Sequence, residues 1–241
     1  MIPIHEIKSR LLHVQDNIEK AAFRSGRKAT DVKLVVVTKA QPVEVVQSVI
    51  EAGARNLGEN YPEETLEKLS GLNIPENLQW HMIGHLQSRK SRIVAENFHY
   101  FHALDSFALA QKLDRILAES ERSLEVLLEC NVGDEETKHG WEIQKPEQLK
   151  EFFADVEKIG QLYHLKVRGL MCMPPLFEDP QATRPFFIRL RKLQMQLKNE
   201  FSEFSWNELS MGTSTDYEVA IEEGATFVRV GTAIVGPRNY S

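Results

Sequence analysis

Short apolar runs alternate with longer amphipathic segments along this chain. The short runs are rich in β-branched and aromatic residues, as strands are. Eight of them predict strands, at residues 33–39, 56–60, 79–84, 100–105, 125–132, 166–172, 208–212 and 227–231. Between them, apolar residues recur three and four positions apart, which predicts helices. The clearest stripes are Leu109, Leu113, Ile116 and Leu117 in one segment, and Phe186, Leu190, Leu193 and Leu197 in another.

Strands that alternate with helices favour a parallel sheet. The chain has 241 residues, the usual size of one barrel domain, and no low-complexity tract or long linker divides it. We therefore predict an α/β protein with one domain over residues 1–241: a single (β/α)8 TIM-type barrel with an extra N-terminal helix over residues 4–25. An open, flavodoxin-like sheet is the alternative, but it has fewer strands.

Composition and charge exclude several classes of protein. The net charge is -6, and no basic stripe of the kind that binds nucleic acid is present. No apolar stretch approaches the roughly 20 residues that span a bilayer, and the first residues lack the apolar core of a signal peptide. Cys130 and Cys172 lie in apolar runs and are expected to be reduced core residues. We therefore expect a cytoplasmic protein that binds neither nucleic acid nor membrane.

Lys39 ends the first predicted strand. Side chains alternate along a strand, so Val35, Val37 and Lys39 share one face. If the valines fill the barrel, the lysine points into its mouth, where functional groups of barrels gather. Partial desolvation there lowers the pKa of an amine and exposes its lone pair, as a Schiff-base lysine requires. The alternative is a lysine that extends to solvent from the strand end.

The seventh predicted strand runs into a segment suited to phosphate. Residues 210–216 (SMGTSTD) offer hydroxyls, a flexible glycine and backbone N–H groups. Thr215 to Glu218 matches a capping box, so a helix is expected to start near Ser214 or Thr215. The N-terminus of a helix attracts anions. The alternative is an ordinary helix cap with no ligand.

The eighth predicted strand adds further candidate groups. Arg229 and Gly231 share one face, Gly231 permits close backbone approach, and Thr232 supplies a hydroxyl donor. Phosphate sites in barrels often follow strands seven and eight. Strand eight neighbours strand one in a closed barrel, so this site is expected beside Lys39. An exposed arginine without function is the alternative.

Several motifs together resemble a known family. They are VVVTKAQP, NLGENYPEE, WHMIGHLQSRK, KHGW, RGLMCMPP, ELSMGTSTDYEVAIEEGAT and VRVGTAIVGPR. In this order, over roughly residues 30–238, they resemble the pyridoxal phosphate homeostasis protein family, whose fold is similar to the N-terminal barrel domain of bacterial alanine racemase. The resemblance implies that the cofactor is pyridoxal 5′-phosphate (PLP).

The resemblance also implies which residues bind the cofactor: Lys39, Asn60, Ser210, Ser214, Arg229, Gly231 and Thr232. Lys39 is implied to form the internal aldimine, and the two serines, Gly231 and Thr232 to hold the phosphate. Arg229 is implied to face the pyridine nitrogen, with the phosphate as its alternative contact. Asn60 is implied to line the pocket. No catalytic residue is predicted.

Three further positions belong to this comparison with the family. Lys138 matches a family lysine after the fifth strand, which is implied to lie near the cofactor and to assist its exchange. His85 stands where a proline is common, and Thr213 where a second methionine is common. Neither departure removes a proposed ligand.

The residues favour a binding protein over a racemase. PLP enzymes usually protonate the pyridine nitrogen, and a permanently charged Arg229 opposite it opposes that protonation. Residues 232–241 are all that follow Gly231, whereas racemases carry a further β-domain that supplies a second base. We predict a monomeric, non-catalytic protein of intracellular PLP homeostasis whose partners include PLP-dependent apoenzymes. A PLP-dependent racemase-like enzyme is the alternative.

Two other chemistries are alternatives for this chain. A Schiff-base aldolase needs an acid or base near Lys39, for which Asp105 and Glu59 are candidates. His81 and His85 are four residues apart, a spacing that binds metal on one face of a helix, but His81 lies in a predicted strand and His85 beyond it, so that geometry fails. Like two further histidines, His99 and His102, these are expected to be structural or solvent-exposed, and no metal is predicted.

Overall fold

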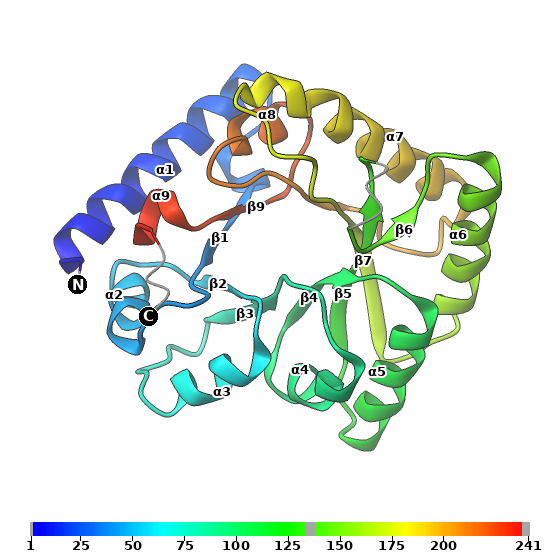
Figure 1. The fold of residues 1–241 in the computed structure, drawn as a ribbon, viewed down its shortest axis with the longest axis horizontal. Helices are drawn as coiled ribbons and strands as arrows, with labels where there is room; N and C mark the ends of the chain where they lie inside the picture. The colour runs from blue at the N-terminus through cyan, green and yellow to red at the C-terminus, as the bar shows by residue number, and fades with distance from the viewer. Residues whose placement is uncertain (1, 134–137, 238–241) are drawn as a thin grey trace.

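Eight parallel strands close into a barrel in the computed structural model, which describes residues 2–133 and 138–237 (Figure 1). Each strand pairs with the next along the chain, and the last pairs with the first. They are β1 (Lys33–Val37), β2 (Asn56–Glu59), β3 (Gln79–Met82), β4 (Tyr100–Leu104), β5 (Leu124–Asn131), β7 (Leu165–Met171), β8 (Glu208–Ser210) and β9 (Phe227–Val230).

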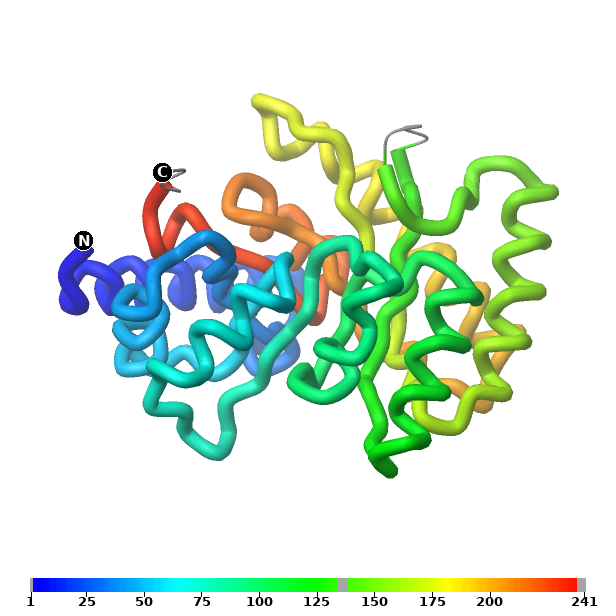
Figure 2. Tube along the Cα trace, turned by 60° about the horizontal axis from the view of Figure 1, so that its bottom comes forward, coloured from blue at the N-terminus to red at the C-terminus, as the bar shows by residue number. Residues whose placement is uncertain are grey.

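Helices surround this ring, as Figure 1 shows. They are α1 (Ile4–Arg24), α2 (Val43–Glu51), α3 (Pro62–Leu69), α4 (Ser91–Asn97), α5 (Phe107–Glu119), α6 (Pro146–Ile159), α7 (Arg184–Glu200), α8 (Tyr217–Glu222) and α9 (Thr232–Val235). Their apolar stripes are buried against the strands, as Leu109, Leu113 and Leu117 of α5 illustrate. In Figure 2 the yellow segment between β7 and α7 stands out from the barrel.

The predicted barrel is confirmed, since all eight predicted strands and the N-terminal helix are present. Two details differ. A short strand β6 (Trp141–Glu142) that was not predicted pairs with β5 outside the ring. In α7 the fully buried position belongs to Phe187, and Phe186 is only half-buried, because the stripe faces the barrel slightly differently from the predicted one.

The predicted start of the helix after β8 is wrong by two to three residues. Helix α8 begins at Tyr217, and Thr215 does not cap it. Instead, the Asp216 carboxylate accepts hydrogen bonds from both the N–H and the hydroxyl of Thr213, at 2.7 and 2.9 Å. These bonds hold residues 213–216 in a turn ahead of the helix.

Helix α1 occupies the place that an eighth outer helix would take. It packs against α2, α8 and α9, and Figure 1 shows it lying along the outside of the β1 and β9 wall. Ile7, Leu11, Val14 and Ile18 form its buried stripe. Because α9 has only four residues, α1 covers the seam where the first and last strands meet.

The barrel interior is unusually polar for a buried core. Apolar side chains dominate the layer between strands and helices, but His81, His102, Ser210 and Arg229 are also buried. Cys130 and Cys172 are buried and unpaired, as predicted. Among the helices of the described residues, none is both long enough and apolar enough to cross a membrane.

Candidate functional site

Lys39 lies just beyond the end of β1, half-buried, in a small pocket that Gly231 and Thr232 also line. The next residue, Ala40, has a φ of 56°, which is uncommon for a residue with a side chain. The Ala40 N–H donates a hydrogen bond to the Glu64 carboxylate at 3.3 Å. The chain therefore turns sharply after Lys39, so the amine is held at the strand end.

A buried ion pair fixes the backbone on the other side of this strand end. The Lys68 ammonium donates to Glu59 Oε1 at 2.8 Å and to the Thr38 carbonyl at 3.0 Å, and the Thr38 hydroxyl donates to the same carboxylate. Burial raises the pKa of the Glu59 carboxyl, and Lys68 opposes that rise. Glu59 is held by Lys68 and Thr38 and is not among the residues that line the pocket of Lys39.

The turn after β8 meets the end of β9. Gly212 has a φ of +91°, and a Cβ there would lie 2.6 Å from Ala220 Cβ, so only glycine fits. The Ser214 hydroxyl accepts a hydrogen bond from the Gly231 N–H at 3.2 Å. A Cβ at Gly231 would lie 3.3 Å from Val37 Cβ, which is tight. The structure thus brings Lys39, Ser214, Gly231 and Thr232 together at the mouth.

Arg229 and Ser210 lie in contact inside the barrel. The Arg229 guanidinium donates to Ser210 Oγ at 2.5 Å, to the Cys172 carbonyl at 3.0 Å and to Met173 Sδ at 2.9 Å. Burial lowers the pKa of Arg229, and no salt bridge to it occurs among the described residues. The Ser210 hydroxyl, implied by the family resemblance to contact phosphate, is fully buried and also bonds His102.

Asn60 follows β2 and has an unused hydrogen-bonding atom. Its Oδ1 is buried and has no hydrogen-bond partner among the described residues. Its side chain packs tightly on Gly84, where a Cβ would lie 2.9 Å from Asn60 Cβ. A buried carbonyl oxygen without a partner costs free energy, so a ligand that donates to it would be favoured.

A charged group of residues comes from the ends of three strands and one loop: His85 follows β3, Asp105 follows β4, Glu129 lies on β5, and Lys138 and His139 lie in the loop after β5. His85 Nδ1 is 2.8 Å from Asp105 Oδ2, and the His85 ring stacks on His139 at 3.7 Å. Lys138 donates to the Met173 carbonyl at 3.0 Å. Burial raises the pKa of Glu129 to about 7, with a further contribution from Asp105.

Spacing in the sequence does not predict this group, because its members are distant in the chain. His85, Asp105 and His139 each offer a ligand atom, and these atoms lie within 4.8 Å of one another. The two imidazole planes are nearly parallel, at 8°, so their in-plane lone pairs do not converge on one point. One ring would have to turn before both could bind a metal.

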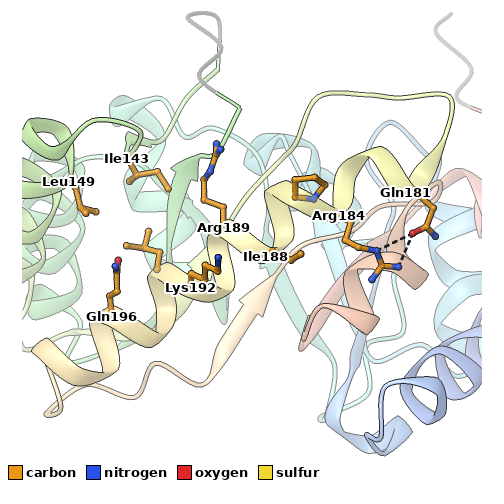
Figure 3. Close-up of a pocket in the computed structure, with 10 residues that line it drawn as sticks. Ile143, Leu149, Gln181, Arg184, Ile188, Arg189, Lys192 and Gln196 are labelled. Carbon is orange, nitrogen blue, oxygen red and sulfur yellow. Dashed lines mark hydrogen bonds between the residues drawn. The ribbon is translucent and has the colours of Figure 1, made fainter.

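A larger hollow lies elsewhere, between α6 and α7 (Figure 3). None of the predicted site residues lines it, and two of its cationic side chains, Arg184 and Arg189, are engaged. Arg184 pairs with Glu222 and Glu223, and Arg189 donates to the Val132 carbonyl. The residues predicted from the sequence therefore lie at the barrel mouth and in its interior, and not in this hollow.

The fold and this site define a barrel of the alanine racemase type. The family model described as "Alanine racemase, N-terminal domain" matches residues 10–239. The alanine racemase of Clostridium difficile 630 in complex with cycloserine gives a TM-score of 0.71 at 16% identity, over 95% of this chain and 59% of the racemase. At that identity the likeness shows a shared fold.

Two relatives with higher identity specify the family. The pyridoxal phosphate homeostasis protein of Aquifex aeolicus (strain VF5) is 41% identical over 231 residues, which are 96% of this chain and 98% of that protein. PipY of Synechococcus elongatus PCC7942, solved with PLP bound, gives a TM-score of 0.81 at 34% identity, over 95% of this chain and 100% of PipY. The chain belongs to the pyridoxal phosphate homeostasis protein family.

Proposed function

We propose that this protein binds PLP at the barrel mouth, with Lys39 as the amine that joins the cofactor covalently, and serves the intracellular homeostasis of PLP. The observation that carries the proposal is the pocket shared by Lys39, Gly231 and Thr232. The binding of PLP by PipY, which has the same fold, supports the choice of cofactor. Bound PLP supplies an electrophilic aldehyde and an electron-withdrawing pyridine ring.

The chain's own residues have separate parts in this proposal. The Ser214 and Thr232 hydroxyls and the backbone N–H groups of residues 212, 214 and 232 bind the phosphate, while the N–H groups of Thr213 and Gly231 hold the two turns in place. Arg229 presents a buried cation without a carboxylate partner among the described residues, which fits an aromatic nitrogen that accepts a hydrogen bond. Asn60 Oδ1, which has no described partner, accepts from a polar group of the ligand.

We place Ser210 differently from the other members of the predicted set. Its hydroxyl touches Arg229 and His102 and is excluded from solvent, so we assign it to Arg229 instead of the phosphate. We assign Lys138 to the rim of the mouth, where its bond to the Met173 carbonyl places it next to a residue that Arg229 also contacts. There it is suited to assist exchange of the cofactor.

The charge of Arg229 supports binding without efficient catalysis. Electron withdrawal by the ring is strongest when its nitrogen is protonated, and a buried guanidinium opposes a second positive charge. We therefore propose a carrier that keeps a reactive aldehyde bound and passes it to PLP-dependent apoenzymes. The relatives are named for homeostasis, which agrees with this role.

A racemase-like activity is the second candidate, and Glu129 is the observation that favours it. Its pKa of about 7 suits a group that moves a proton near neutral pH, and its Oε2 has no hydrogen-bond partner among the described residues. It stands on β5, four strands around the ring from β1. An acid or base there would act from across the mouth.

One pair of assays separates the two candidates. The protein loaded with PLP is incubated with L-alanine and other common amino acids, and chiral chromatography follows the D isomer; we expect no turnover. In parallel, the loaded protein is mixed with a PLP-dependent apoenzyme, whose activity should return. Racemisation at about 1 s⁻¹ or faster, lost in Glu129→Gln, would replace the carrier proposal by the enzyme.

We further propose that the protein is a cytoplasmic monomer. The two buried free thiols fit a reducing compartment. The most exposed large apolar side chains, Phe23, Tyr163 and Leu176, belong to α1 and to two separate loops instead of one face. Light scattering on a sizing column measures the mass directly, and a dimer would contradict the proposal.

A further inference from the structure

A chain of hydrogen bonds crosses the barrel interior behind Arg229. It runs from Arg229 on β9 to Ser210 on β8, His102 on β4, His81 on β3 and Asn56 at the start of β2. The successive distances are 2.5 Å from Arg229 to Ser210, 2.8 Å to His102 Nδ1, 2.9 Å between the imidazoles and 3.1 Å from His81 Nε2 to Asn56 Oδ1. The three middle side chains are fully buried.

The chemistry of the first member fixes the direction of every bond. A guanidinium only donates, so Ser210 Oγ accepts from Arg229. The Ser210 hydrogen is then available for His102 Nδ1, which accepts it. A neutral imidazole with an accepting Nδ1 carries its proton on Nε2. His102 Nε2 therefore donates to His81 Nδ1, and His81 Nε2 in turn donates to Asn56 Oδ1.

The opposite direction leaves polar groups without partners. If His102 Nδ1 donated to Ser210, the serine oxygen would accept twice and its own hydrogen would have no acceptor among the described residues. The Asn56 amide would also have to turn its NH2 toward His81. A buried hydroxyl without a hydrogen-bond partner costs more free energy than a weak hydrogen bond contributes. The first direction is therefore favoured.

The surroundings of the two imidazoles keep them uncharged. Tyr100 stacks on His81 at 4.8 Å, and the Phe227 ring contacts both imidazoles edge-on. Burial, followed by the positive charges of His99 and Lys33, lowers the pKa of His81 to about 3. Burial, His81, Arg229 and Lys33 lower the pKa of His102 well below its ordinary value. A protonated ring would have no accepting nitrogen and would break the chain.

We propose that Ser210, His102 and His81 are positioning residues that orient the Arg229 guanidinium toward the barrel mouth through a one-directional chain of hydrogen bonds. Each member turns the negative end of its dipole toward the cation. The chain therefore stabilises the charge of Arg229 without neutralising it, as a carboxylate would. The effect on the cofactor rests on the proposed function, because it assumes that Arg229 faces the PLP ring.

Two consequences follow for a ligand at the mouth. The guanidinium keeps its full positive charge, so it favours a ring nitrogen with a free lone pair over a protonated one. Its bonds to Ser210 and to the Cys172 carbonyl leave little freedom of rotation. Truncation of His102 should therefore change the electronic properties of the bound ring as well as the affinity.

The first test uses the protein without cofactor. Nitrogen NMR of isotope-labelled imidazoles, assigned with the His81→Gln and His102→Gln variants, reports which nitrogen carries the proton. We expect both rings to be neutral with the proton on Nε2, and to remain so between about pH 5 and 8, where ordinary histidines titrate. A proton on Nδ1 of either ring, or titration in this range, would overturn the proposal even if PLP binds as proposed.

The second test uses the PLP-loaded protein. Ser210→Ala and His102→Leu should bind PLP about tenfold more weakly, the loss expected for a hydrogen bond to a charged group, and should shift the pH at which the visible band changes. His102→Gln, which can accept and donate, should restore part of both. Tyr100→Phe keeps the ring that stacks on His81 and should match the parent.

The outcomes separate this inference from the proposed function. A parent protein that never becomes coloured with PLP, while the NMR result holds, would reject the cofactor and leave the hydrogen-bond chain intact. Spectra of His102→Leu and Ser210→Ala identical to that of the parent would reject the positioning role. Equal shifts in Tyr100→Phe would show a general effect of packing and would also reject it.

Discussion

The two sides of the barrel mouth use different means to present chemistry. The anchoring side, formed by Lys39, Ser214, Gly231 and Thr232, relies on backbone N–H groups, hydroxyls and glycines that permit close approach. The charged side, formed by His85, Asp105, Glu129 and His139, relies on contacts between side chains and on the raised pKa of Glu129. The first is suited to hold an anion in one place, and the second to respond to pH.

This contrast also decides what a substitution can do. On the anchoring side the geometry is set by three neighbouring strands, β8, β9 and β1, so small changes in shape should abolish binding. On the charged side the His85–Asp105 pair is partly exposed, and such pairs contribute little, whereas the buried Glu129 should act mainly through pH. Five substitutions test this difference, from the largest effect to the smallest.

Lys39→Ala should abolish covalent attachment of PLP. The parent protein should be yellow and, after borohydride reduction, should carry the cofactor on Lys39 by mass spectrometry. Lys39→Arg keeps the positive charge but cannot form the bond, so it separates attachment from electrostatics. Adducts on Lys138 or Lys68 in the parent would place the reactive amine elsewhere and remove the basis of the comparison.

Gly212→Ala should destabilise the fold by about 3 kcal/mol, because a strained φ and a steric clash act together. The new Cβ would lie 2.8 Å from Tyr217 Cα. Gly53→Ala is the matched control, since Gly53 also has a positive φ, +107°, but no atom within 4 Å. Urea unfolding compares the two. Equal losses would mean that the clash at Gly212 is relieved at no cost.

Glu129→Gln should change how stability depends on pH. The folded pKa of Glu129 is raised to about 7, so its contribution to stability is present below the unfolded pKa of about 4.3 and is lost as pH rises through 7. The free energies of unfolding of parent and variant should therefore diverge by about 1.4 kcal/mol per pH unit between these values. Glu19→Gln, an exposed change on α1, is the matched control.

The buried imidazoles act in the opposite sense. The folded pKa of His81 is about 3, so its stabilisation is complete above the unfolded pKa of about 6.5 and is lost as pH falls toward 3. Glu129 therefore offsets part of this acid sensitivity in the parent. Below the unfolded pKa of about 4.3 the Glu129 carboxyl is neutral in both states, so Glu129→Gln and the parent should unfold at the same pH during acid titration, followed by circular dichroism.

Ser214→Ala should weaken PLP binding about tenfold with little change in stability, because it removes one hydrogen bond to a charged phosphate. Ser106→Ala, on the opposite side of the mouth, is a control with the reverse expectation for stability and affinity. Ser106 caps α5 by accepting from the Leu109 N–H, so its loss should cost about 1 kcal/mol of stability and leave PLP affinity unchanged. Titration of PLP and thermal melts measure both quantities for each variant.

His85→Ala should have the smallest effect. The His85–Asp105 pair is partly exposed, at 40% for the histidine side chain, and such pairs contribute below about 1 kcal/mol. Stability and PLP affinity should both stay close to the parent values. A tenfold change in affinity would show that the charged side contacts the cofactor, and would end the distinction between the two sides.

The sequence predicted the anchoring side because its residues follow consecutive strands. Alternation along β1 placed Lys39 toward the mouth, and closure of the ring placed β9 beside it. Local turn geometry was harder to predict: Asp216, and not Thr215, organises the turn before α8, since both residue types favour such positions.

The chain of hydrogen bonds behind Arg229 and the charged side could not be predicted from the sequence in the same way. His81 and His102 lie on neighbouring strands, and their inward direction follows from alternation, but contact with Ser210 requires a bond across the barrel. His139 reaches His85 through a loop whose path no periodicity describes. Strand patterns specify which face a side chain occupies; they do not specify which distant side chain meets it.

Helix α1 closes the seam between the first and last strands, and this has a consequence for how the chain can be rearranged. A Cβ at Gly236 would lie 2.7 Å from the Ile2 side chain, so the two ends of the described chain are neighbours. Joining them with a short linker and opening an outer loop, such as the one between α6 and β7, should give a circular permutant. The new termini would lie far from the seam between β1 and β9, and the barrel would keep the same order of strands.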